Sequence, residues 1–343
     1  MARLTGSTAL RRALIAIAVF IAAIFVIDLL SDFRQSQAAS VASLAIAAGG
    51  LTVLTGLNGQ LSLGHGAFMA IGAYTTAKLL QDGREVPLLV LLVAALLVTL
   101  AVGAVVGVAA ARLQGPYVAG ATLALAVAVP SLAVHFRDTF GGEPGLRVST
   151  PDLPPIADDA LFFLTGTEVG TTQWLATVSV ACLVLTYFLL RNLSTSRVGR
   201  QWRAVRDDPV AAQLAGINLG RNRVVCFVVS TACAGLAGAL MALATRVAAP
   251  SGFHLVLSLT LLMAVVLGGM GALSGALVGA ALLTLLPTYV TNVGSSVGLS
   301  DLQSAELAPL VLGLTTMLVI LLAPGGLVGS LAPLIRRART SRS

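Results

Sequence analysis

Long apolar stretches recur along almost the whole chain, and they limit its possible folds more than any other feature. A helix needs about 20 largely apolar residues to cross the hydrocarbon core of a bilayer. Windows of about that length are predicted as membrane segments at 13–30, 38–57, 66–80, 87–111, 116–136, 173–190, 223–244, 256–270, 272–291 and 306–322. Hydrophobic residues make up 57% of the 343 residues and charged residues only 10%, which excludes a soluble core. We therefore expect an all-α, polytopic helical bundle of roughly eight to ten segments, forming a single domain over residues 1–343.

Two places in this pattern are less regular than the rest. The window at 66–80 is short and contains glycine, and two windows meet at the sequence GGMGALSG, residues 268–275. Either place could be re-entrant instead of spanning.

The basic residues indicate which ends of the segments face the cytoplasm. The formal net charge is +7, and the arginines gather at the ends of apolar runs, as the positive-inside rule expects. With the N-terminus inside, alternation places the loop at about 137–172 outside and the segment at about 191–223 inside. The C-terminal arginines are then inside as well (Arg336, Arg337, Arg339 and Arg342). We expect a multi-pass inner-membrane protein with cytoplasmic termini and no affinity for nucleic acid.

The first window follows Arg3, Arg11 and Arg12 and could pass for a signal peptide. No clear small-residue cleavage site comes after it, which favours an uncleaved first span.

The segment 191–223 is far more charged than its surroundings and holds seven arginines. Asp208 followed by Pro209 divides it, because the residue before proline is pushed out of helical geometry while proline itself suits a first helical turn. Two short helices are therefore predicted. In the first, apolar residues share one face and arginines another (Val198, Trp202 and Val205 against Arg200, Arg203 and Arg206).

In the second helix, Asp208 can cap the N-terminus and Gly216 can close the C-terminus. Val210 and Leu214 form an apolar stripe between them. A segment this charged, yet still patterned for helix, suggests a docking surface for a water-soluble partner. The alternative is a basic helix resting on anionic headgroups, but that alternative gives no reason for the break at Asp208, so docking is favoured.

Glycine and polar residues also interrupt the apolar pattern in GLNGQLSLGHGAFMAIGAY, residues 56–74. Broken backbone at membrane depth must be buried in protein or line a watery cavity, because unpaired N–H and C=O groups are costly in hydrocarbon. We interpret Asn58, Gln60, Ser62 and His65 as part of a translocation pathway or its gate. The alternative is a tight cytoplasmic turn, and His65 alone is more often a structural histidine than a proton relay.

Small residues recur at four-residue spacing in two further stretches (Ser230, Ala234 and Gly238, then Gly271, Gly275 and Gly279). Such spacing lets helix backbones approach closely in lipid. The contact is either internal, which we favour, or with a second permease subunit.

Several kinds of site are missing from the sequence. Lys78 is the only lysine, and no GxxxxGK pattern surrounds it, so the chain has no Walker A nucleotide site. No HExxH motif, nucleophile elbow or intramembrane carboxylate pair points to an enzyme, so we expect no catalytic residues. Cys182, Cys226 and Cys233 lie inside apolar runs without a CxxC pair, so neither a metal site nor a cofactor is expected.

Five motifs in order resemble the inner-membrane permeases of branched-chain amino acid ABC importers, and most of all the larger of the two permease subunits. They are GLNGQLSLGHGAFMAIGAY (56–74), TFGGEPGL (139–146), GRQWRAVRDDPVAAQLAGINLGRNRVVCFVVSTACAGLAGAL (199–240), AVVLGGMGALSGALVGA (264–280) and APGGLVG (323–329). Two departures are mild. Pro209 stands where an acidic residue is common, and Gly66 stands where alanine is usual.

The resemblance implies a heterodimer with a second permease subunit, two cytoplasmic ATPase subunits and an extracytoplasmic solute-binding protein. It also implies that the loop from about Gly199 to Gly216 is the ATPase-coupling region. The residues expected to make that contact are Trp202, Arg203, Arg206, Asp207, Asp208 and Gly216.

We therefore expect half of the translocation pathway of an ABC importer, moving branched-chain amino acids or related small solutes such as urea or amides. The alternative is a stand-alone secondary transporter or channel for a small polar solute. Buried midplane acids would be more usual in an ion-coupled transporter.

Overall fold

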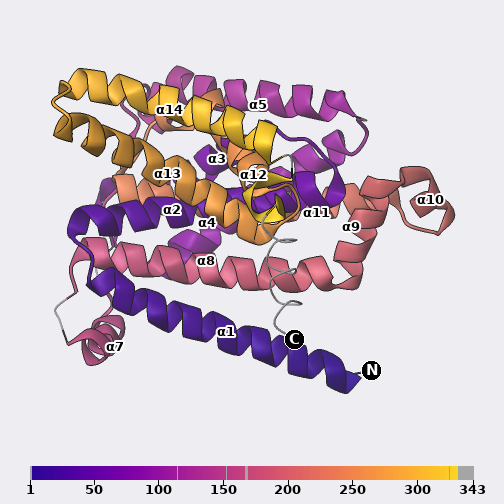
Figure 1. Cartoon of the computed structure of the whole chain (residues 1–343), viewed down its shortest axis with the longest axis horizontal. Coiled ribbons are helices and arrows are strands. Elements are labelled where there is room, and N and C mark those ends of the chain that lie inside the picture. The colour runs from indigo at the N-terminus through magenta and orange to yellow at the C-terminus, as the bar shows by residue number, and fades with distance from the viewer. Residues whose placement is uncertain (1, 114, 152, 167–168, 324, 331–343) are drawn as a thin grey trace.

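A computed structural model describes residues 2–113, 115–151, 153–166, 169–323 and 325–330 (Figure 1). The described chain is almost entirely helical, as the apolar windows predict. The α-helices are α1 (Ala2–Asp28), α2 (Asp32–Leu51), α3 (His65–Leu79), α4 (Leu88–Ala110), α5 (Pro116–His135), α6 (Arg137–Phe140), α7 (Pro155–Thr165), α8 (Thr171–Thr195), α9 (Arg197–Asp207), α10 (Pro209–Leu214), α11 (Leu219–Thr245), α12 (Leu255–Gly268), α13 (Leu273–Ser296) and α14 (Asp301–Leu322). A π-helix, η1 (Thr52–Leu57), continues α2, and short 3₁₀ turns form η2 (Gln81–Gly83) and η3 (Pro250–Phe253). Strands β1 (Leu146–Arg147) and β2 (Val247–Ala248) pair antiparallel.

Nine helical stretches of the described residues are long and apolar enough to cross a membrane. This number lies within the predicted range of eight to ten, but it is one fewer than the ten windows. The difference is the window at 66–80. Its helix, α3, has 15 residues, fewer than the roughly 20 that a complete span needs. An irregular stretch at 59–64 precedes it, so this part of the chain is helical over only part of its length.

Contacts between small residues hold the middle of the bundle together. Helix α11 packs against α2, α3 and α4. A Cβ added at Gly72 would overlap the backbone of Gly235, and one added at Gly238 would overlap the carbonyl of Met69. A Cβ added at Gly279 would likewise overlap the backbone of Ala264. Both stretches of small residues therefore make internal helix contacts, in agreement with the favoured interpretation.

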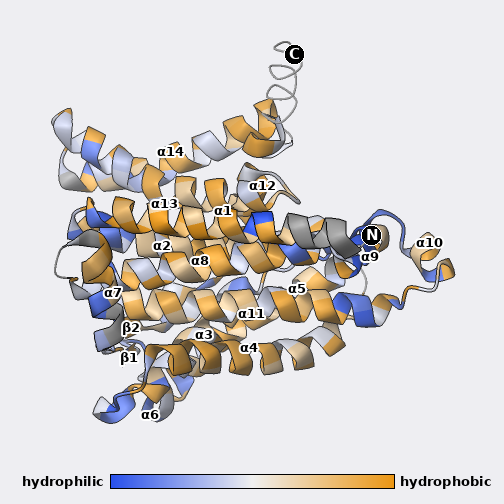
Figure 2. Ribbon diagram, turned by 90° about the horizontal axis from the view of Figure 1, so that it is seen from below, coloured by the Kyte–Doolittle hydropathy of each residue, from blue (hydrophilic) through white to orange (hydrophobic). Residues whose placement is uncertain are grey.

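The two ends of the bundle differ (Figure 1). Helices α9 and α10 project from one end, where α1 also begins, while α6, α7 and the β1–β2 pair lie at the other. The loop at 137–172 and the segment at 191–223 are thus at opposite ends, as the alternation requires. The long helices are hydrophobic along most of their length, and hydrophilic residues gather at both ends (Figure 2). The C-terminal arginines at 336, 337, 339 and 342 lie outside the described residues.

Candidate functional site

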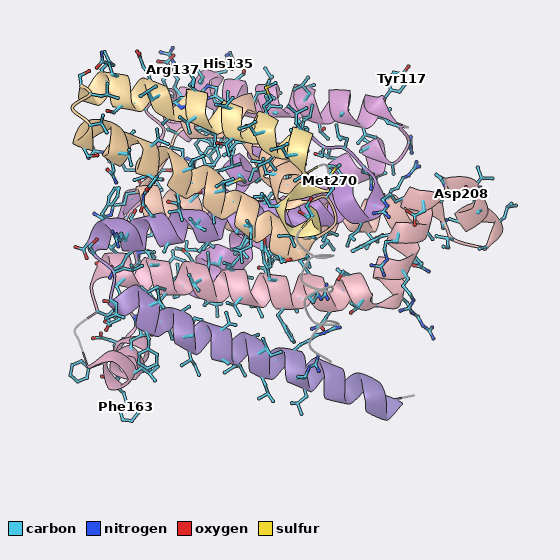
Figure 3. The ribbon with its side chains drawn as sticks, viewed as in Figure 1. Tyr117, His135, Arg137, Phe163, Asp208 and Met270 are labelled. Carbon is cyan, nitrogen blue, oxygen red and sulfur yellow. The ribbon has the colours of Figure 1, made fainter. Side chains whose placement is uncertain are left out.

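The charged segment forms two short helices with a sharp break, as the sequence predicts. Asp208 has φ −153° and ψ 100°, an extended conformation that ends α9. Its carboxylate oxygen Oδ1 accepts hydrogen bonds from the N–H groups of Val210 (2.9 Å) and Ala211 (3.0 Å), which caps α10. Gly216 has φ +84° just after the end of α10, the conformation with which glycine commonly closes a helix. Figure 3 shows Asp208 at the projecting end of the molecule.

Helix α9 is anchored to the bundle by one apolar face. Gly199, Trp202 and Val205 are buried, and Val198 packs partly buried against the same core. The Trp202 side chain is 0% exposed. In this conformation Trp202 therefore has no surface to offer a partner, and its role is to hold α9 against the membrane helices.

Two arginines of α9 bind the end of the preceding helix. Arg200 Nη1 donates to the carbonyl of Thr195 (3.2 Å), and Arg203 Nη1 donates to the carbonyl of Ser194 (3.1 Å). The last carbonyls of a helix have no partner within it and carry partial negative charge. These two arginines thus provide hydrogen-bond donors for the last carbonyl groups of α8, and they fix the angle between α8 and α9.

Arg206 reaches a different element. Its Nη1 donates to the carbonyl of Gly56 in η1 (2.6 Å), while Nε and Nη2 contact Asp207 Oδ1 (2.9 and 2.7 Å). A Cβ added at Gly59 would lie 2.9 Å from Arg206 Cγ, so only glycine leaves room for this side chain. Gly59 also has φ +76°, which glycine adopts readily. Helices α9 and α10 together form a charged hairpin (197–214). Arg206 is therefore a direct link between this hairpin and the interrupted segment that follows α2.

The exposed side of the hairpin is apolar at its tip. Val210 is 68% exposed and Leu214 is 85% exposed. Arg206, Asp207 and Asp208 are exposed beside them. Apolar side chains rimmed by charges are typical of a protein interaction site, so the α9–α10 hairpin has the composition of a docking surface.

The interrupted segment lies directly beneath this hairpin. The π-helix η1 widens the end of α2, and π-turns of this kind occur often at functional sites. A Cβ at Gly56 would overlap the backbone of Gly271, in the loop that joins α12 to α13. Gly56 is thus held between that loop and the guanidinium of Arg206. Met270, in the same loop, is labelled in Figure 3.

The four polar residues predicted in this segment are all buried: Asn58 (3% exposed), Gln60 (7%), Ser62 (0%) and His65 (0%). Asn58 Nδ2 donates to Asn222 Oδ1 (3.0 Å), and Gln60 Nε2 donates to Asn58 Oδ1 (2.7 Å) and to the carbonyl of Arg223 (3.1 Å). These bonds tie the segment to the first turns of α11. Ser62 Oγ accepts from the N–H of Gly64 (3.4 Å).

His65 bridges α3 and α11. Its Nε2 lies 2.8 Å from Ser230 Oγ, and the Ser230 hydroxyl donates to the carbonyl of Gly50 (2.7 Å). Because the hydroxyl has one hydrogen, which Gly50 accepts, His65 Nε2 must donate and the imidazole is the Nε2–H tautomer. This arrangement is typical of a structural histidine.

A cavity of about 130 Å³ separates the hairpin from the interrupted segment. Asn58, Gly59 and Gln60 line one side, and Val205, Arg206 and Pro209 line another. The two predicted groups therefore meet only through Arg206 on one side and Asn58 and Gln60 on the other. The other predicted residues do not line this cavity (Ser62, His65, Trp202, Arg203, Asp207, Asp208 and Gly216). The sequence did not reveal Gly56, Gly59, Asn222 and Arg223 as their partners, because backbone acceptors and glycine contacts leave no side-chain pattern.

Among the described residues, no group of three or more His, Cys, Asp or Glu side chains could hold a metal ion.

Comparison with known proteins identifies related sequences. The family described as branched-chain amino acid transport system, permease component, matches residues 35–321. The chain is 30% identical over 304 residues to the high-affinity branched-chain amino acid transport system permease protein LivM of Salmonella typhimurium, with 84% of this chain and 68% of LivM covered. It is 28% identical over 298 residues to LivH of Escherichia coli K12, with 83% and 91% covered. The permease BraD of Pseudomonas aeruginosa is 26% identical over 261 residues, with 73% and 82% covered. No solved structure matches the chain.

Proposed function

Because the chain belongs to the family of permease components of branched-chain amino acid transport systems, we propose that its α9–α10 hairpin is the surface on which a cytoplasmic ATPase docks. The chain is a multi-pass membrane protein and a permease subunit of an ABC importer. In this proposal it forms half of the pathway beside a second permease subunit, with two ATPase subunits and an extracytoplasmic solute-binding protein. It hydrolyses no ATP itself, and both of its termini are cytoplasmic.

The exposed apolar tip of the hairpin carries the proposal. Val210 and Leu214 are exposed on α10, which projects from the membrane bundle (Figure 1), and no helix of the described residues covers them. The capped break at Asp208 and the buried Trp202 hold them in a fixed position. A rigid projection with an apolar tip and a charged rim suits insertion into a groove of a soluble protein.

Movement of the docked hairpin would reach the membrane through Arg206. This side chain joins α9 to Gly56 and packs on Gly59, at the start of the irregular stretch 59–64. A shift of α9 would therefore pull on η1 and on the hydrogen bonds of Asn58 and Gln60. We propose that these two residues, with Ser62 and His65, form a gate element, since all four are buried and bonded within the chain.

For the cargo, we propose branched-chain amino acids, the solutes for which LivM and LivH are named. Uptake of labelled leucine, isoleucine and valine by the assembled system, compared with uptake of urea and short amides, tests this assignment. Faster uptake of urea or an amide than of all three amino acids would reject it.

The docking surface is tested by Leu214→Glu, with Leu29→Glu as its control. Both leucines are 85% exposed, but Leu29 lies in the turn between α1 and α2, at the opposite end. A carboxylate buried in an apolar contact is strongly unfavourable. We expect Leu214→Glu to weaken copurification of the ATPase by at least tenfold and to abolish uptake, whereas Leu29→Glu leaves ATPase copurification unchanged.

Unchanged copurification and uptake in Leu214→Glu would refute the docking role. Solute uptake by proteoliposomes that contain this chain and no ATPase would instead support a stand-alone secondary transporter or channel.

A further inference from the structure

A second, larger cavity lies away from the hairpin. It has a volume of about 550 Å³ and is walled by α3, α4 and the end of α5 with α6. Its position is marked by His135 and Arg137, which Figure 3 shows at the end of the molecule opposite Asp208. Cavities of about 300–1,000 Å³ hold molecules of drug size, so this one is larger than a single amino acid requires.

The cavity has an exposed edge on the side of the helical bundle. Most of its lining is apolar, and Val98 (42% exposed), Leu132 (51%) and Phe136 (51%) stand at its edge. A water molecule needs two to four polar partners to be held in a cavity. The lining offers polar side chains only at Tyr74, Thr75 and Lys78, so over the rest of its length the cavity favours a hydrocarbon chain over water.

Two polar groups of α3 meet the cavity toward its outer end. The Tyr74 side chain is 5% exposed, and its hydroxyl has no hydrogen-bond partner in the described part of the chain. A buried hydroxyl without a partner is unfavourable, which points to a missing acceptor. Lys78, one turn farther, donates from Nζ only to the neutral Gln81 Oε1 (2.8 Å), with no carboxylate within ion-pair distance among the described residues.

We propose that this cavity is a phospholipid site. One acyl chain fills the space over α3 between α4 and α5. The lipid phosphate binds the ammonium of Lys78, and an ester oxygen of the lipid accepts a hydrogen bond from the hydroxyl of Tyr74. Lys78 is in the last turn of α3, next to the polar turn at Gln81–Gly83, where headgroups lie. A cation without a carboxylate partner prefers an anionic headgroup, so phosphatidylglycerol should bind more tightly than phosphatidylcholine.

The proposal does not depend on ATPase docking, because the site and the hairpin lie at opposite ends of the bundle. It is tested on the full-length chain, purified with the subunits that accompany it, by native mass spectrometry with added phosphatidylglycerol or phosphatidylcholine. Lys78→Gln should reduce retained phosphatidylglycerol about fivefold, while Lys78→Arg keeps most of it. Arg84→Gln removes an exposed charge from the following loop and should have no effect.

The acyl chain is tested by phosphatidylglycerol with a photoreactive group in its tail. The expected labels lie in residues 71–79 and 129–140. Val129→Trp, which fills the cavity, should remove them. Val127→Trp is the matched control, since Val127 is on the same helix, 54% exposed and outside the cavity lining.

Three results would overturn the proposal: equal retention of phosphatidylglycerol by Lys78→Gln and the unmodified chain, labelling that Val129→Trp does not change, or capture of the second permease subunit by a crosslinker placed at Thr75. The last result would assign the cavity to a protein contact.

Discussion

Arg206→Gln separates docking of the ATPase from transmission of its movement. In the structure, Arg206 Nη1 donates to the Gly56 carbonyl at 2.6 Å, and the side chain is 39% exposed. A hydrogen bond from a charged donor contributes about 1.5–3 kcal/mol, and partial exposure to solvent lowers this to about 1–2 kcal/mol. The contact with the adjacent Asp207 adds little, because it is exposed. A loss of about 1.4 kcal/mol corresponds to a factor of ten.

The assay is reconstitution of the complete importer in proteoliposomes, with leucine uptake and ATP hydrolysis measured together. Arg206→Gln should keep the ATPase bound, because the apolar tip at Val210 and Leu214 is unchanged. Hydrolysis should continue, but leucine moved per ATP should fall about tenfold, because α9 no longer pulls on the Gly56 carbonyl.

Arg200→Gln is the control. Arg200 also donates to a backbone carbonyl, that of Thr195 at 3.2 Å, but this acceptor is only five residues away in the sequence and does not belong to the interrupted segment. Equal transport per ATP in both variants would refute the coupling role of Arg206. Loss of the ATPase from Arg206→Gln would show that Arg206 is a docking contact instead.

Two further substitutions test how the helices are held. Gly238→Val should lower the melting temperature of the permease, because its Cβ would overlap the Met69 carbonyl, a clash that costs about 1–3 kcal/mol. Gly120→Ala is the control and should leave the melting temperature unchanged, because its added Cβ meets open space. Equal melting temperatures of the two variants would contradict the close packing of α3 on α11. Asp208→Ala should speed amide exchange in the first turn of α10 by about fivefold, because the cap contributes about 1 kcal/mol. Asp208→Asn should keep slow exchange, and no change in Asp208→Ala would show that the cap is dispensable.

Features governed by neighbours in the sequence could be predicted. The break at Asp208, its cap and the closing glycine at 216 all follow from the local chemistry of a few adjacent residues, and the structure has each of them. The apolar face around Trp202 was likewise visible as helical spacing. The membrane helices were predicted because length and hydropathy are also local properties.

Features that depend on distant parts of the chain could not be predicted. Residues 56 and 206 are separated by 150 positions, and their link ends on a backbone carbonyl, which every residue has. The window at 66–80 matches α3 in length, but hydropathy alone does not show that the chain before it leaves the helical conformation, so the window was counted with the complete spans. The hydrogen-bond acceptors of Arg200 and Arg203 could not be predicted either, because they too are backbone carbonyls.

The exposed leucine at the tip of α10 has a consequence for biogenesis. A newly inserted permease holds Val210 and Leu214 in water on a rigid support until a partner covers them. Unassembled copies should therefore be prone to self-association and attractive to chaperones and proteases, which recognise exposed apolar side chains. The supply of ATPase subunits would then set how much permease persists in the membrane, so that subunit ratios are adjusted by degradation of the excess.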